Sequence, residues 1–126
     1  MSDEDEDTLL IFQTSGIDTP KRTYAPLFFA TTAAAMDIET TMWFTMGGVT
    51  QLKKGNAEKV ELVEGSGVTL KTWLDRALEA GVRICACHQA LEVENWTRED
   101  LIDGVEIIGA ASVIDMCFEA GHVMYF

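Results

Sequence analysis

Cysteine is the residue type in this chain that is best suited to chemistry. Cys87 ends an apolar run that begins at Val82, and we expect it to lie where a strand gives way to a helix or turn. Free backbone N–H groups and the positive end of a helix dipole stabilise a thiolate at such a point, and a thiolate is a competent nucleophile. The adjacent His88 could add a charge or a proton route. Position alone leaves open the alternative of a buried, inert cysteine, because cysteine is among the most buried residue types.

Two further cysteines accompany Cys87. Cys85 alternates with it along the expected strand, so both side chains point to the same face. Their Cα atoms would lie about 6.6 Å apart, at the outer limit for a disulfide, so a bond between them would be strained. Cys117 falls in an expected helix and is interpreted as a core residue. Three cysteines in a short chain with no secretory signal are typical of reduced intracellular thiols.

Other chemical motifs are missing from the sequence. The cysteines and the two histidines lack the paired spacing of common zinc modules, so we expect no metal site. There is no G-x-G-x-x-G motif, no P-loop and no G-x-S-x-G motif. We therefore expect neither a nucleotide cofactor nor serine hydrolase chemistry.

Strand-like and helix-like segments alternate along the chain. The expected strands are residues 8–13, 39–46, 82–87, 105–108 and 122–126. The expected helices are residues 22–37, 68–80 and 110–120. This alternation predicts one α/β domain over residues 8–126, a three-layer α/β/α sandwich with a mostly parallel five-stranded sheet. An acidic disordered tail is expected at residues 1–7, and a glycine-broken flexible excursion at residues 54–67.

In parallel sheets, ligands bind beyond the carboxyl ends of the strands. Cys87 and His88 fall at one such end, with Cys85 just before it. The glycines at two other strand ends let backbone N–H groups approach a bound anion closely. The candidate ligand-binding residues are therefore Gly16, Gly47 and Gly48, although Gly47-Gly48 alone is more often a tight turn.

The chain is strongly acidic, with a net charge of −12 from 9 basic and 21 acidic residues. Such a surface repels phosphate backbones and anionic lipids, so we expect neither nucleic acid nor membrane partners. The longest apolar stretch, residues 25–36, is too short to span a bilayer, so we expect a cytoplasmic protein with no membrane insertion. The same stretch has almost no polar face, which predicts burial against another copy of the chain.

Several of these segments resemble the DsrE/DsrF-like sulfur-relay family, and most closely its branch often labelled peroxiredoxin family protein. They are Thr14-Ser-Gly16, residues 30–36, Thr45-Met-Gly-Gly48, Gly81-Val-Arg-Ile-Cys-Ala-Cys87 and Glu99-Asp-Leu-Ile-Asp-Gly-Val105. The resemblance covers nearly the whole chain after the acidic tail.

The resemblance implies a DsrE-like sheet sandwich that assembles as a homo-oligomer, often a trimer or hexamer. It also implies a cysteine that accepts sulfane sulfur as a persulfide and passes it to a partner. By position Cys87 matches that cysteine, whereas Cys85 and His88 are not part of the family's pattern. The peroxiredoxin label does not imply a peroxidase, because Ile84 stands where the peroxidatic motif has threonine.

The leading hypothesis is a cytoplasmic sulfur carrier or sulfurtransferase. Cys87 would take sulfur from a persulfide donor and yield it to the thiol of a partner protein or a small molecule. One alternative is a non-catalytic oligomeric module that binds a small ligand or a partner. The other is a thiol redox switch built from Cys85 and Cys87. A gain of one sulfur atom on Cys87 would indicate the carrier, and reversible loss of two thiols on mild oxidation would indicate the switch.

Overall fold

The computed structural model describes residues 7–126, so the tail expected at residues 1–7 lies outside the described residues except for Asp7. Five strands form one sheet in the order β4-β3-β2-β1-β5. Every strand pair is parallel, which confirms the predicted parallel α/β sheet. The strands are β1 (Thr8–Gln13), β2 (Glu39–Phe44), β3 (Arg83–Cys87), β4 (Val105–Ile108) and β5 (His122–Tyr125).

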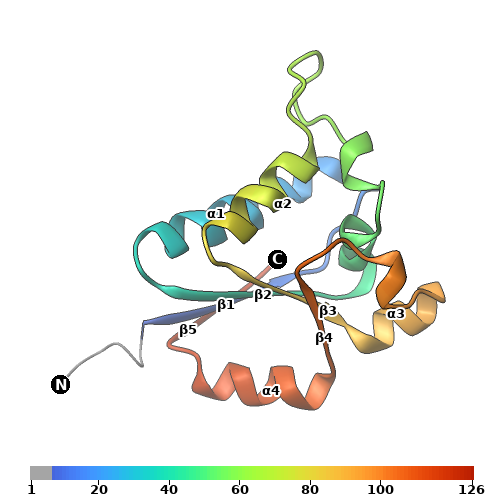
Figure 1. The fold of residues 1–126 in the computed structure, drawn as a ribbon. Coiled ribbons are helices and arrows are strands. Elements are labelled where there is room, and N and C mark those ends of the chain that lie inside the picture. Colours follow the sequence, from blue (N-terminus) through green and yellow to red (C-terminus); the bar gives the residue numbers. More distant parts are fainter. Residues whose placement is uncertain (1–6) are drawn as a thin grey trace.

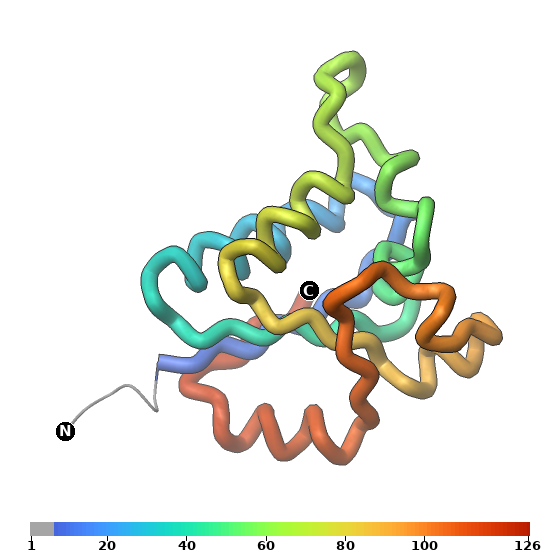
Figure 2. The backbone as a smooth tube through the Cα atoms, in the orientation of Figure 1, coloured from blue at the N-terminus to red at the C-terminus, as the bar shows by residue number. Residues whose placement is uncertain are grey.

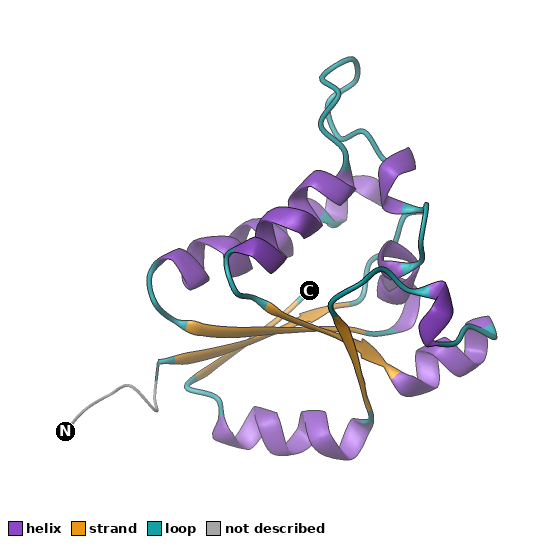
Figure 3. Cartoon of the chain, in the orientation of Figure 1, coloured by secondary structure: helices purple, strands orange, loops and turns teal. Residues whose placement is uncertain are grey.

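Helices cover both faces of the sheet and make the predicted three-layer sandwich (Figures 1 and 3). Helices α1 (Tyr24–Ala35) and α2 (Leu70–Glu79) lie together on one face, and α4 (Ala110–Glu119) lies on the other. Helix α3 (His88–Glu94) continues from β3 at the edge of the sheet. The short 3₁₀ helices are η1 (Pro20–Arg22), η2 (Met46–Leu52), η3 (Ala57–Lys59) and η4 (Arg98–Asp100).

The core forms where the strand side chains meet these helices. The largest fully buried side chains of the strands are Leu10, Ile11, Met42, Phe44 and Ile84. Burying one such side chain stabilises the fold by roughly 1.5–3 kcal/mol. Because adjacent residues point to opposite faces, the buried pair Leu10 and Ile11 packs under both helical layers, as the continuous apolar run of β1 predicts.

Helix α2 shows how local sequence sets an element's bounds. Thr69 is its N-cap, and Thr69 and Thr72 form a reciprocal capping box. Leu70, Leu74 and Ala77 make its buried stripe, and the chain turns at Gly81 with a φ of 94°. A positive φ of this size suits glycine, and the helix ends close to the expected bound at residue 80.

Two helices leave apolar side chains exposed. Helix α1 buries Pro26, Leu27, Ala30 and Ala33 but exposes Phe28, Phe29 and Met36. Helix α4 exposes Ile114 and Phe118, the latter at 88% of its surface. Exposed apolar surface of this kind is typical of protein contacts. The α1 surface agrees with the sequence expectation, whereas the sequence analysis did not single out α4.

The prediction of a flexible excursion at residues 54–67 is wrong for the first half of that segment. Ala57 and Val60 are buried, and the Asn56 Nδ2 atom donates a hydrogen bond of 2.9 Å to the Thr50 carbonyl oxygen. Residues 63–67 alone form an exposed loop tip, which projects at the top of Figure 2. The glycine content of the segment suggested flexibility, but the buried side chains of Ala57 and Val60 hold residues 57–60 against the core.

Candidate functional site

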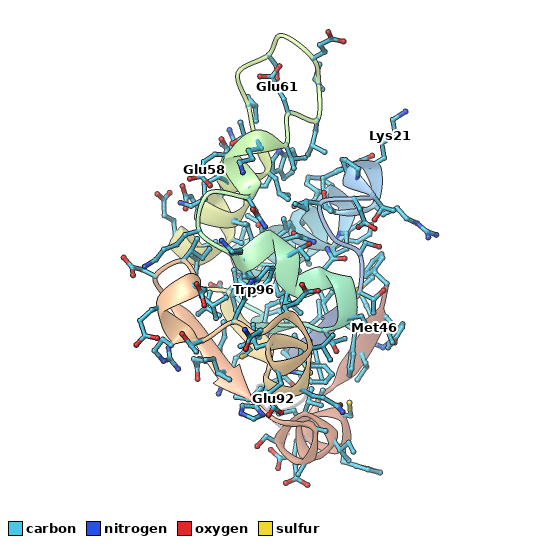
Figure 4. All side chains as sticks on the ribbon, turned by 90° about the vertical axis from the view of Figure 1, so that its right-hand side faces the viewer. Lys21, Met46, Glu58, Glu61, Glu92 and Trp96 are labelled. Carbon is cyan, nitrogen blue, oxygen red and sulfur yellow. The ribbon has the colours of Figure 1, made fainter. Side chains whose placement is uncertain are left out.

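Cys87 lies at the strand end that the sequence predicts. It is the last residue of β3 and the N-cap of α3, with a φ of −68° and a ψ of 119°. Its extended backbone lets the helix begin directly at His88. No side chain caps the first turn of α3, so its leading N–H groups have no side-chain acceptor. Figure 4 looks onto this edge of the molecule.

Burial distinguishes the three cysteines, all of which are free thiols. Cys87 is 5% exposed, Cys85 is fully buried and Cys117 is half-buried. Burial raises the pKa of the Cys85 thiol to about 11, a rise that Arg83 opposes and Glu106 reinforces. Cys85 therefore stays protonated at neutral pH and is a poor nucleophile there.

An aromatic row flanks the two strand cysteines on the β2 side. Trp43 pairs with Cys85 across the β2–β3 ladder, and Phe12 pairs with Trp43 across the β1–β2 ladder. The Phe12 ring meets the Trp43 ring edge to face with centroids 5.4 Å apart, and it stacks on Tyr125 at 5.0 Å. This aromatic row shares its face of the sheet with Cys85 and Cys87, and on the other side Cys85 pairs with Glu106, which forms an ion pair with Arg83.

His88 follows Cys87 in the chain but lies on the outside of α3. Its Nδ1 atom is 3.4 Å from the Glu92 Oε1 atom, and the two side chains are 64% and 68% exposed. Within residues 7–126, no hydrogen bond joins the His88 ring to Cys87 or Cys85. The structure thus brings Cys85 and Cys87 together on one face and leaves His88 outside.

The candidate glycines lie where the loops after β1 and β2 approach each other. A Cβ atom at Gly16 would overlap the Gly47 carbonyl oxygen, and one at Gly48 would overlap the Gln13 carbonyl oxygen. A Cβ atom at Gly47 would meet nothing closer than 3.5 Å. Gly16 and Gly48 therefore have a packing role, and η2, which contains Gly47 and Gly48, contacts both β3 and α3.

Two buried glutamines fix the loop after β1, and the sequence analysis missed them. Gln13 donates to the Thr23 carbonyl oxygen at 3.2 Å and accepts from the Ser15 N–H at 3.1 Å. Gln51 donates to the Ser15 carbonyl oxygen at 2.7 Å. Both glutamines are fully buried. A polar residue closing an otherwise apolar strand run, as Gln13 does, is the signal that could have revealed this network.

Over residues 7–126, no three His, Cys, Asp or Glu side chains lie close enough together to hold a metal ion. None of the helices in this part of the chain is both long enough and apolar enough to cross a bilayer.

The fold and the site define a small parallel α/β protein with a buried cysteine where its third strand ends. The chain belongs to the DsrE/DsrF-like family, whose model matches residues 7–126. The family resemblance noted in the sequence is thereby confirmed.

Two curated relatives are similar to the chain. One is an uncharacterised protein of Methanocaldococcus jannaschii, MJ0760, which is 27% identical over 109 residues and 86% of this chain. The other is the sulfur carrier protein DsrE2 of Allochromatium vinosum, which is 23% identical over 81% of this chain and 88% of that protein. The chain spans only 39% of the length of MJ0760.

Two solved structures have a similar fold. The ychN protein from E. coli superposes with a TM-score of 0.76 and 17% identity. The protein of unknown function MTH1491 from Methanobacterium thermoautotrophicum superposes with a TM-score of 0.62 and 18% identity. In both cases the match covers 94% of this chain and 98% of the other. At these identities the two structures confirm the fold.

Proposed function

We propose that this protein is a sulfur carrier in which Cys87 holds one sulfane sulfur as a persulfide and passes it to an acceptor thiol. The observation that carries the proposal is the placement of Cys87 at the end of β3, directly before α3. Membership of the DsrE/DsrF-like family and similarity to the sulfur carrier DsrE2 support a sulfur-relay role.

The transfer needs only thiol chemistry. The Cys87 thiolate attacks the terminal sulfur of a donor persulfide, R–S–SH; the donor S–S bond breaks, and the donor leaves as its thiolate. Cys87 then carries S–SH. In the second step an acceptor thiolate attacks the terminal sulfur, and Cys87 leaves as a thiolate. The sulfane sulfur keeps its oxidation state throughout, so neither step consumes an oxidant or a reductant.

The protonation state of Cys85 protects the carried sulfur in this scheme. A thiolate at Cys85 could attack the inner sulfur of the Cys87 persulfide, forming a disulfide and releasing hydrosulfide. Because burial raises the pKa of Cys85 to about 11, very little thiolate is present near neutral pH. The raised pKa of Cys85 also weighs against a Cys85–Cys87 redox switch. A disulfide between residues i and i+2 of one strand would in addition be strained.

Assembly of several copies is part of the proposal. The exposed apolar side chains of α1 and α4 give each copy two faces that need cover. A trimer or hexamer fits the family resemblance. The partners of the relay are a sulfur donor and an acceptor thiol. Closed symmetry is the usual arrangement of soluble homo-oligomers.

The test is mass spectrometry of the intact protein after incubation with polysulfide. The wild-type chain and the Cys117→Ser variant should gain the mass of one sulfur atom, which peptide mapping places on Cys87. The Cys87→Ser variant should gain none and should keep the circular dichroism spectrum of the wild type. Full loading of the Cys87→Ser variant on another residue would refute the assignment.

A further inference from the structure

A pocket lies at the start of α1 and α2, on the face of the sheet opposite α4. Its volume is about 700 Å³, within the range of ligand sites in proteins. Tyr24 and Trp73 contribute aromatic walls, and Leu62, Val63 and Val68 come from the chain around the exposed loop tip. We call it the aromatic pocket. Nothing in the carrier chemistry of Cys87 uses it.

The aromatic walls are organised but incompletely covered. The Tyr24 and Trp73 ring centroids are 6.1 Å apart, and Phe28 meets Trp73 edge-on at 6.2 Å. Tyr24 remains 43% exposed and Val63 68% exposed. Apolar surface gathered around a cavity in this way favours the binding of an apolar group.

Two cations border the aromatic pocket. The Arg76 guanidinium lies 5.8 Å from the Trp73 ring centroid, and Lys21 of η1 also lines the pocket. Figure 4 shows Lys21 projecting at the same end of the molecule as the segment that carries Glu61. Within residues 7–126 neither cation forms an ion pair, and the Glu61 carboxylate accepts a hydrogen bond from the Gly65 N–H.

These features point to one ligand chemistry. We propose that the aromatic pocket binds a small amphiphilic anion, a planar apolar body bearing one carboxylate or sulfonate. The body would pack against Trp73 and Tyr24, whose rings are tilted by 56° to each other. A guanidinium that lies over an aromatic ring still presents its N–H edge to an anion, so Arg76 and Lys21 would hold the charged group. Two cations on a chain of net charge −12 suit a monoanion better than a polyphosphate.

The probe for the test is 8-anilinonaphthalene-1-sulfonate, with its uncharged relative N-phenyl-1-naphthylamine as the matched comparison. Titrated into the full chain, the sulfonate should bind saturably at one equivalent per chain and more tightly than the neutral probe. Lys21→Gln and Arg76→Gln should each lower the affinity for the sulfonate by about 2- to 5-fold, the range for one exposed ion pair. Lys59→Gln, which removes an exposed cation outside the pocket, should leave the affinity unchanged.

Tryptophan fluorescence locates the bound probe. Energy transfer from tryptophan to the probe should fall sharply in Trp73→Phe and persist in Trp96→Phe. Four results would overturn the proposal: non-saturable binding, equal affinity for the neutral probe, unchanged affinity in both cation variants, or unchanged transfer in Trp73→Phe. The Cys87→Ser variant should bind the probe like the wild type, so this test is independent of the carrier proposal.

Discussion

Cys87 pairs with Ile108 across the ladder between β3 and β4, and each of these two residues ends its strand just before a helix. Helix α3 begins immediately after Cys87, and α4 begins after the single residue Gly109. Neither helix has a side-chain cap on its first turn. The first turns of two helices therefore begin at the same end of the sheet, next to the thiol that is proposed to carry sulfur.

The three cysteines should react with iodoacetamide in a fixed order. Near neutral pH we expect Cys87 to be modified first and Cys117 more slowly, even though Cys117 is the more exposed of the two. Cys85 should react only as the pH approaches about 11, because its pKa lies there. Peptide mapping across a pH series measures the three rates. Modification of Cys117 ahead of Cys87 would contradict the assignment of the nucleophile.

A persulfide loaded on Cys87 should be long-lived near neutral pH and should decay faster as the pH rises. The acceleration should follow deprotonation of Cys85, whose pKa is about 11, since that thiolate attacks the persulfide and expels hydrosulfide. Sulfide release from loaded protein measures the decay. Cys85→Ser should remove most of the alkaline acceleration, whereas Cys117→Ser should not. An acceleration unaffected by Cys85→Ser would exclude this route of loss.

Stability should also fall at alkaline pH. A group whose pKa is raised by folding adds stability below its unfolded value and loses it as the pH rises through its folded value. For Cys85 that window runs from 9.0 to about 11. Urea denaturation at several pH values should show the free energy of unfolding declining across it, and Cys85→Ala should flatten the decline. An equal decline in Cys85→Ala would show that other groups cause it.

The two adjacent glycines of η2 should respond differently to substitution. Gly48→Ala places a Cβ atom against the Gln13 carbonyl oxygen and should destabilise the fold by about 1–3 kcal/mol, a typical cost of overpacking. Gly47→Ala should cost less, because its nearest contact would be 3.5 Å away. Urea denaturation compares the two. Equal destabilisation would mean that close backbone packing is not what requires glycine at residue 48.

Assembly should depend on the exposed faces of α1 and α4. Light scattering should detect an oligomer that strengthens with ionic strength, since salt screens the repulsion between copies of charge −12. Phe28→Glu and Phe118→Glu should shift the protein toward monomer. Val93→Glu adds the same charge at an exposed position on α3 and should not. A monomeric wild type at every salt concentration would contradict this prediction.

The sequence predicted the order of elements well because most boundaries carry local signals. Thr69 and Gly81 bracket α2 close to its expected bounds, and Thr97 forms a capping box with Asp100 at η4. The bounds of β4, residues 105–108, agree with the expectation. In these places local hydrogen bonding and backbone conformation decide the structure, and both can be read from neighbouring residues.

The rest depends on contacts between distant segments. The raised pKa of Cys85 comes from burial, which the sequence does not display residue by residue. The packing of Gly16 against Gly47 joins two loops that follow different strands. His88 was placed in the site by adjacency to Cys87, but the turn of α3 carries its side chain outward to Glu92. Sequence alone identified the strand end and left its surroundings undetermined.

The position of β5 has a consequence for the order of folding. This strand completes the sheet by pairing with β1, and Thr14 donates a hydrogen bond of 2.6 Å to the carbonyl oxygen of Phe126, 112 residues away. During synthesis, β1 therefore keeps an open edge until β5 has left the ribosome. Contacts of such long sequence separation slow folding, and an open strand edge invites pairing with other chains. The nascent sheet is thus most vulnerable to aggregation just before β5 docks on β1.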